Sequence, residues 1–151
     1  MAVEVRSIEA GQALIVTTAR GRMMLRFGPN GLGCGVGEGR ISADMAEPLL
    51  GAYDKLIERG GRAVVFFDGW DVTGADAQLV ETAGSWVLKQ RATIVTHALV
   101  RSKLLELSVS MINLVSRRAS VELYTDRDKF HAAARRDWPG FTAPSLAPRE
   151  G

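Results

Sequence analysis

The first forty residues alternate short apolar runs with glycine-containing turns. Each run is rich in aliphatic or β-branched side chains, which is typical of strands bounded by turns. Short connections favour antiparallel neighbours, so we expect hairpins or a meander at this end of the chain. The predicted strands span residues 3–8, 13–18, 23–27 and 32–36.

The fourth of these strands carries glycine at every second position. Within residues 31–39, Leu32, Cys34 and Val36 share one face, and the other face carries only glycine. A bare face indicates that something approaches the backbone closely, either a packed helix or strand or a ligand. The spacing does not match the G-x-G-x-x-G pattern of dinucleotide sites, because the third glycine is missing. We therefore predict no site of that kind.

After residue 40 the apolar spacing becomes that of an amphipathic helix. We predict Asp44 as its N-cap, with Glu47 completing a capping box. Gly60 and Gly61 then end the helix, as glycine commonly does. The apolar stripe of this helix comprises Met45, Leu49, Tyr53 and Leu56.

Apolar strands and helices alternate over the rest of the chain. The uninterrupted apolar run 62–67 is typical of a central strand that is buried on both faces. Thr73 and Asp76 form the capping signature of a second helix. This alternation implies right-handed crossovers and helices packed on a mixed sheet. The other predicted elements are strands 93–99 and 120–124 and helices 102–116 and 126–138.

The length of 151 residues suits one domain with one core. We expect an α/β fold with antiparallel N-terminal strands, parallel central strands and about four helices. The domain is predicted to span residues 1–138, of which 1–30 are an N-terminal strand extension. The remaining residues, 139–151, hold three of the five prolines and are expected to be a flexible tail.

Charge and cysteine content exclude several classes of protein. Nineteen basic and seventeen acidic residues give a net charge of +2, far from the dense basic footprint of a nucleic-acid binder. No apolar stretch approaches the roughly 18 residues of a spanning helix, so any membrane contact is expected to be peripheral. Cys34 is the single cysteine, and the N-terminus lacks the pattern of a secretion signal. We therefore expect a cytoplasmic protein.

The predicted third helix is apolar around more than half of its circumference. A helix that lies on a sheet needs a narrower apolar stripe. The surplus must be covered by a neighbouring helix, a second subunit, a ligand or a membrane surface. The apolar residues are Leu104, Leu105, Leu107, Val109, Met111, Ile112, Leu114 and Val115.

Residues suited to catalysis are few. His97 and His131 lack a Ser, Cys or Asp partner at a recognisable spacing, and one cysteine with two distant histidines does not make a structural zinc site. We predict no catalytic residue, no metal and no cofactor. An enzyme would need polar groups to converge near Asp68, Asp71 and His97.

The segment 68–74 is the one candidate for a functional loop. It follows the carboxyl end of a central strand and enters a helix, an edge where open α/β sheets commonly bind ligands. Asp68, Trp70 and Asp71 supply two carboxylates and an indole, and the helix N-terminus offers free N–H groups to an anion. A purely structural interpretation makes Thr73 an N-cap, Asp71 a turn former and Trp70 a partly buried anchor.

Two stretches resemble the STAS domain of anti-sigma-factor antagonists: GRI at residues 39–41 before the first helix, and RAVVFFDGWDVTG at residues 62–74 before the second. The sequence is most similar to the SpoIIAA-like subgroup, with Gly69, Trp70 and Asp71 after the central strand. The resemblance covers about residues 31–137 and implies a non-catalytic regulatory domain.

The resemblance carries two functional expectations. Antagonist members present a phosphorylated serine in a short Asp-Ser-Ser/Thr-Gly motif. Asp71, Thr73 and Gly74 match that motif, but Val72 stands at the acceptor position, so Thr73 is the candidate phosphoacceptor. The SpoIIAA-like subgroup instead implies lipophilic ligands or peripheral membrane association, with helices that shift to open an apolar cleft.

Two hypotheses follow. The first is regulated binding to a protein partner or to a second copy, through the loop at residues 70–74, the start of the second helix and the exposed side of the third. The second is a carrier or sensor of a small apolar ligand, held between the sheet and the third helix by Leu105, Val109 and Ile112.

Overall fold

A computed structural model describes residues 3–146 of the chain. Within these residues a single seven-stranded sheet runs in sequence order from β1 to β7. The first four strands pair antiparallel and the last four pair parallel, so β4 belongs to both halves. The predicted α/β fold with a mixed sheet is confirmed. The strands are β1 (Glu4–Ile8), β2 (Ala13–Thr17), β3 (Gly21–Phe27), β4 (Leu32–Ile41), β5 (Arg62–Ala75), β6 (Thr93–Val100) and β7 (Val121–Tyr124).

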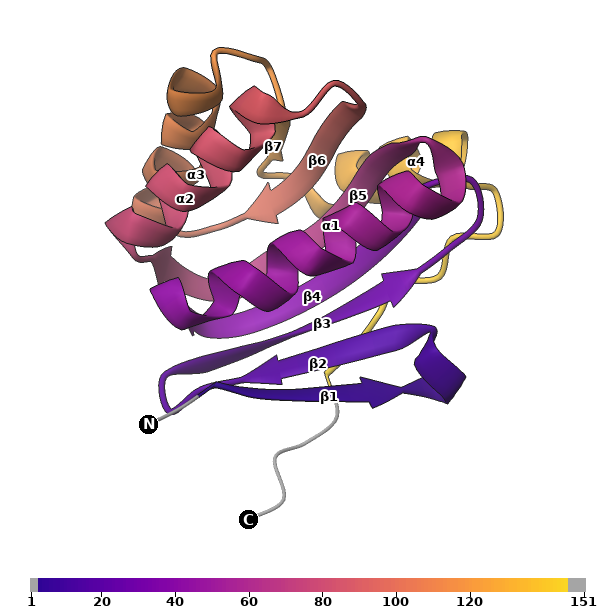
Figure 1. Cartoon of the computed structure of the whole chain (residues 1–151), viewed down its shortest axis with the longest axis horizontal. Coiled ribbons are helices and arrows are strands. Elements are labelled where there is room, and N and C mark those ends of the chain that lie inside the picture. Colours follow the sequence, from indigo (N-terminus) through magenta and orange to yellow (C-terminus); the bar gives the residue numbers. More distant parts are fainter. Residues whose placement is uncertain (1–2, 147–151) are drawn as a thin grey trace.

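One α-helix follows each parallel strand of the described chain. Right-handed crossovers that all step in the same direction put α1, α2 and α3 on one face of the sheet (Figure 1). Phe130 and Ala134 of α4 pack with Phe66 in a separate cluster on the opposite face. The helices are α1 (Ala46–Gly60), α2 (Ala77–Lys89), α3 (Lys103–Ser116) and α4 (Arg127–Asp137).

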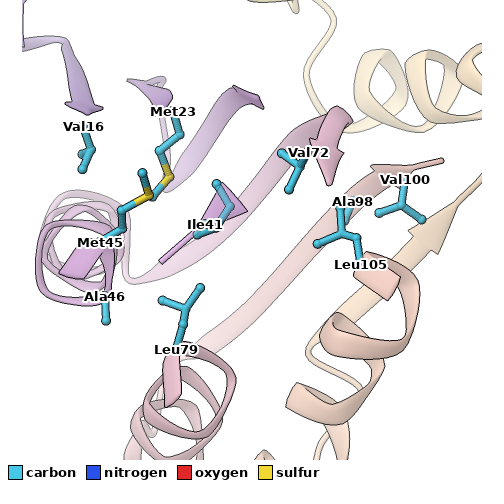
Figure 2. Close-up of a cluster of buried hydrophobic side chains, with 10 residues drawn as sticks. All are labelled: Val16, Met23, Ile41, Met45, Ala46, Val72, Leu79, Ala98, Val100 and Leu105. Atoms are coloured by element: carbon cyan, nitrogen blue, oxygen red, sulfur yellow. The ribbon is translucent and has the colours of Figure 1, made fainter. Parts of the chain in front are cut away.

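The larger core lies between the sheet and helices α1 to α3. Figure 2 shows part of it, where side chains of β2 to β6 converge with Ala46 of α1, Leu79 of α2 and Leu105 of α3. Val16 and Met23 of the antiparallel half lie near Met45, which directly precedes α1. Ala98 of β6 faces Leu105 of α3. This core joins the antiparallel and parallel halves into one unit.

The glycine face of β4 is turned toward this core, where neighbouring side chains fill it. A Cβ atom at Gly33 would lie 3.0 Å from Leu56 Cδ1 of α1. A Cβ atom at Gly35 would lie 2.7 Å from Leu25 Cδ2 of β3. The bare face of β4 therefore allows a helix and a neighbouring strand to pack closely against the backbone. Of the two interpretations of the glycine face, a packed element or a ligand, this is the first.

Strand β5 is longer than the apolar run that predicted it. It continues to Ala75 because β4 continues to Ile41, and the two strands stay paired in parallel through two irregularities of register. The predicted loop at residues 68–74 is therefore wrong, since this segment is strand. The N-cap residue of α2 is Asp76 and not Thr73, so that capping prediction is wrong as well.

The start of α1 also differs from the prediction. Asp44 lies in a 3₁₀ turn, and the N-cap position of α1 is occupied by Met45 without a side-chain hydrogen bond. The predicted cap at Asp44 is therefore wrong. A carboxylate from elsewhere in the chain binds here instead: Asp76 accepts a hydrogen bond from the Ala43 N–H at 3.0 Å and one from Arg40 Nε at 2.6 Å. These contacts tie the starts of α1 and α2 together.

Part of the segment expected to be a loose tail is packed. Residues 138–146 form no helix or strand, but the Phe141 side chain is buried. Its ring centroid lies 6.1 Å from that of Phe66 and 5.9 Å from that of Trp138. This stretch thus adds to the core on the α4 side of the sheet. The rest of the expected tail, 147–151, lies outside the described residues.

Candidate functional site

Helix α3 carries apolar side chains on two sides. Leu105 is buried against the sheet, and Val109 and Ile112 are half-buried on the same side. The opposite side is exposed, and nothing in the described chain covers it. We call these four residues the outer stripe: Leu104, Leu107, Met111 and Leu114, which are 69%, 64%, 42% and 69% exposed. The surplus of apolar surface predicted for this helix is therefore left open in part by the fold.

A cavity of about 130 Å³ lies between the sheet and helices α1, α2 and α3. The three residues predicted to line a ligand cleft, Leu105, Val109 and Ile112, all line it. Helices α1 and α2 contribute further apolar side chains, and β6 contributes Ala98 and Val100. The fold thus brings the predicted ligand residues together around one space.

A pair of hydroxyl groups is the main polar feature of this cavity. Tyr53 Oη of α1 lies 2.6 Å from Thr96 Oγ1 of β6, and both residues line the space. Burial raises the pKa of Tyr53 to about 12, so the phenol keeps its proton at neutral pH. Each hydroxyl has one hydrogen, and their mutual hydrogen bond uses only one of the two. The second hydrogen is suited to an acceptor on a ligand.

The carboxylates and the indole at the end of β5 form a compact charged cluster. Asp68 Oδ2 accepts a hydrogen bond from Arg127 Nη1 at 3.0 Å, and Asp71 lies 3.7 Å from Arg101 Nη2. Both guanidinium groups also lie over the ring of Trp70, at 5.4 Å for Arg101 and 5.3 Å for Arg127. Two positive and two negative groups therefore balance here. The cluster links β5 to the starts of α3 and α4.

Thr73 and Gly74 lie farther along the same strand. The Thr73 side chain is exposed, and its carbonyl accepts a hydrogen bond from Ser102 Oγ at 3.1 Å. Gly74 is buried, and a Cβ atom there would lie 3.1 Å from Arg40 Nη1. Thr73 thus stands within strand β5 and not at the N-terminus of α2. Its phosphorylation stays a prediction.

His97 lies on the opposite face of the sheet from the cavity. Its ring stacks on Phe66 at 4.6 Å, and Nδ1 lies 3.0 Å from both Tyr124 Oη and Glu122 Oε2. Burial lowers the pKa of His97, while the Glu122 carboxylate opposes that shift. The hydrogen bonds and ion pairs of the described residues do not join His97 to Asp68 or to Asp71.

Two further groups carry buried reactive or titratable atoms. The Cys34 thiol is buried, and burial raises its pKa to about 11, so it stays protonated at neutral pH. His131 Nε2 is buried without a hydrogen-bond partner among the described residues. In the same part of the chain, no three metal-binding side chains come together, and no helix has both the length and the apolar character for crossing a membrane.

The sequence does not point to Tyr53 or Thr96 as members of a site. Tyr53 belongs to the apolar stripe of the first predicted helix, and Thr96 lies within the predicted strand 93–99. The Tyr53–Thr96 pair joins residues 43 positions apart, and a hydroxyl leaves no periodic signal. The position of Tyr53 on the apolar side of its helix was the only sign in the sequence that it could line a site.

No family model matches this chain, and neither the curated proteins nor the solved structures include a match to it. The described residues establish an α/β fold with a mixed seven-stranded sheet and four α-helices, and the resemblance to the STAS domain stays a prediction.

Proposed function

We propose that this protein is a non-catalytic binding domain that takes a small apolar ligand into the cavity between the sheet and α1 to α3. The observation that carries this proposal is the cavity itself, lined almost entirely by apolar side chains and containing the Tyr53–Thr96 hydroxyl pair. An engineered apolar cavity of about 150 Å³ holds benzene. The space here, at about 130 Å³, suits a group of similar size.

The energetics of packing support a ligand in this space. Native cores seldom keep voids larger than a water molecule. An empty apolar cavity costs about 24 cal/mol per Å³, so the 130 Å³ here correspond to about 3 kcal/mol. A ligand that fills the space recovers part of that cost, which makes binding favourable without a new polar contact.

Benzene is a suitable probe for this proposal. At tenfold excess over its Kd, benzene is expected to raise the free energy of unfolding by about 1.4 kcal/mol. In the Ala83→Leu variant the larger side chain enters the cavity from α2, so the benzene effect should disappear. Thermal unfolding with and without benzene measures both effects.

A matched control adds the same atoms outside the cavity. Ala119→Leu enlarges an exposed alanine and should leave the benzene effect unchanged. Native mass spectrometry of the purified protein, which detects a retained small molecule, gives an independent reading. If the natural chain neither retains a ligand nor responds to benzene, the proposal is refuted.

The outer stripe of α3 supports a second function, binding of a protein partner. Its four residues are spaced by three, four and three positions, which is the a/d spacing of a two-heptad helical seam. Ser108 and Ser110 beside the stripe are small enough for a second helix to lie close. We infer that the occupant is an amphipathic helix of another protein.

Charge indicates that the partner helix is acidic. Lys103 and Arg117 are exposed near the two ends of the outer stripe. Glu106 is the one acidic residue of α3, and its carboxylate lies 3.3 Å from Lys103 Nζ. Pairing α3 antiparallel with its own copy would bring Lys103 toward Arg117, so charge disfavours that arrangement.

A designed pair of peptides tests this second function. A leucine-heptad peptide with glutamate at its flanking positions is expected to bind, and the same peptide with lysine is not. The double variant Leu107→Gln/Leu114→Gln should lose binding by at least tenfold, while its unfolding free energy changes by less than about 0.5 kcal/mol because both sites are exposed. Fluorescence anisotropy measures the binding.

Leu88→Gln on α2 is the control, because Leu88 is 45% exposed and lies outside the outer stripe. It should bind the acidic peptide normally. Self-association that requires Leu107 and Leu114, or binding to anionic vesicles in place of the peptide, would overturn the assignment of a helical protein partner.

A further inference from the structure

A groove on the outside of α2 adjoins the cavity. It is lined by one residue of α1, Leu50, and by residues of α2, and we call it the α1–α2 groove. Leu50 and Trp86 line both the groove and the cavity. The two spaces are therefore separated by these two side chains, both of which are half-buried.

The boundary between α2 and α3 is closed by tight packing. A Cβ atom at Gly84 of α2 would lie only 2.6 Å from Val115 Cβ of α3, so the two helices are as close as glycine permits. The boundary between α3 and β7 is closed by a double hydrogen bond: the Asn113 side chain donates to the Val121 carbonyl at 2.9 Å and accepts from its N–H at 2.8 Å. A ligand cannot pass at either place without breaking these contacts.

The boundary between α1 and α2 is held differently. At the starts of the two helices, Asp76 binds Arg40 and Ala43. Farther along, the contact is an edge-to-face pair of Tyr53 and Trp86, with ring centroids 6.1 Å apart. Side chains can change rotamer without moving a helix, so this is the boundary that opens at least cost. The opening leads into the α1–α2 groove.

The chemistry of the groove differs from that of the cavity. Its α2 residues outside Trp86 are all polar: Gln78, Glu81, Thr82, Ser85 and Lys89. They supply hydrogen-bond donors and acceptors within reach of water. A ligand that extends from the cavity past Trp86 would thus place its outer end among polar groups.

We propose that the ligand is an amphiphile, with an apolar part of about the size of one ring in the cavity and a polar head in the α1–α2 groove. This inference rests on the proposed function and specifies its ligand class. The apolar part is limited by the 130 Å³ of the cavity. The head is selected by its ability to hydrogen-bond with α2.

Two probes of equal carbon skeleton test the inference: propylbenzene and 3-phenylpropan-1-ol. A hydroxyl group buried without a partner weakens binding. The alcohol is therefore expected to bind at least as tightly as the hydrocarbon only if its hydroxyl finds a partner, either the Tyr53–Thr96 pair inside the cavity or the polar side chains of the groove. A variant of the groove distinguishes these two partners. If the hydroxyl lies in the groove, the Thr82→Ala/Ser85→Ala variant should weaken the affinity for the alcohol about fivefold to tenfold. The affinity for propylbenzene should not change.

Two variants and one control locate the ligand. Ala83→Leu should abolish binding of both probes, because it fills the cavity. Trp86→Ala should accelerate dissociation of both by removing the side chain between the cavity and the groove, whereas Trp70→Ala, on the opposite face, should not. Titration calorimetry and stopped-flow fluorescence provide the affinities and the rates.

The outcomes separate the two proposals. If propylbenzene binds in the cavity but the alcohol binds more weakly and the Thr82→Ala/Ser85→Ala variant changes nothing, the amphiphile inference is refuted and the apolar ligand remains. If neither probe binds, the proposed function fails as well. Alcohol binding that survives Ala83→Leu would place the ligand outside the cavity and overturn the inference.

Discussion

Replacing Phe66 with alanine is expected to lower the free energy of unfolding by about 3–5 kcal/mol. Phe66 is 0% exposed at the centre of the sheet, on the face that α4 covers. Its ring stacks on His97 at 4.6 Å and lies 6.4 Å from Phe130. Alanine would leave a void between three separate parts of the chain, β6, α4 and the segment after α4. The free energy of unfolding of a typical domain is only about 5–15 kcal/mol, so this variant should be close to unfolding.

Urea unfolding followed by circular dichroism measures this loss. Phe66→Leu is the matched control, because it keeps most of the volume and should cost clearly less. Limited proteolysis adds a local reading, since residues 138–146 should become accessible in Phe66→Ala. A loss below about 1 kcal/mol would contradict the packing of Phe130 and Phe141 on the sheet.

The spacing of apolar residues was enough to predict the order of the strands and helices along the chain. The continuous run 62–67 predicted a central buried strand, and β5 does lie between β4 and β6 in the middle of the parallel half. The helical spacing after residue 102 predicted α3, and Ser102 caps it by accepting the Leu105 N–H at 3.3 Å. These signals are local, because each depends on residues within one element.

The end of β5 could not be predicted in that way. Residues 68–74 contain Asp, Gly and Thr, which usually form turns. The segment is nevertheless strand, because β4 runs alongside it as far as Ile41 and supplies hydrogen-bond partners through two irregularities. A long-range pairing thus overrides local preference. The same pairing moves the N-cap of α2 to Asp76 and leaves Thr73 on an exposed strand position.

The candidate site was predicted in part. The surplus of apolar residues in α3 predicts that something beyond the sheet covers the helix, and it favours a ligand cleft lined by Leu105, Val109 and Ile112. The structure divides that surplus between the cavity and the outer stripe. The polar contacts of the site depend on residues far apart in the sequence, such as Tyr53 and Thr96, and no pattern within one element contains that information.

A substitution on the glycine face of β4 is expected to have the second large effect on stability. Gly35→Ala is expected to lower the free energy of unfolding by about 1–3 kcal/mol through overpacking. The new Cβ atom would lie 2.8 Å from the Met24 carbonyl oxygen and 3.0 Å from Phe67 Cδ2, besides its contact with Leu25. The oxygen belongs to the backbone of a paired strand, so it cannot move without disturbing the pairing of β3 with β4.

Gly51→Ala is the matched control, and its expected effect has the opposite sign. Gly51 is exposed within α1, and a Cβ atom there would have no neighbour within 4 Å. Alanine favours the helix over glycine by up to about 1 kcal/mol, so this variant should be more stable than the natural chain. Chemical unfolding of both variants measures the contrast. If Gly35→Ala were as stable as Gly51→Ala, β4 would not be packed as tightly as described, and the bare face of its glycines would again be open to a ligand.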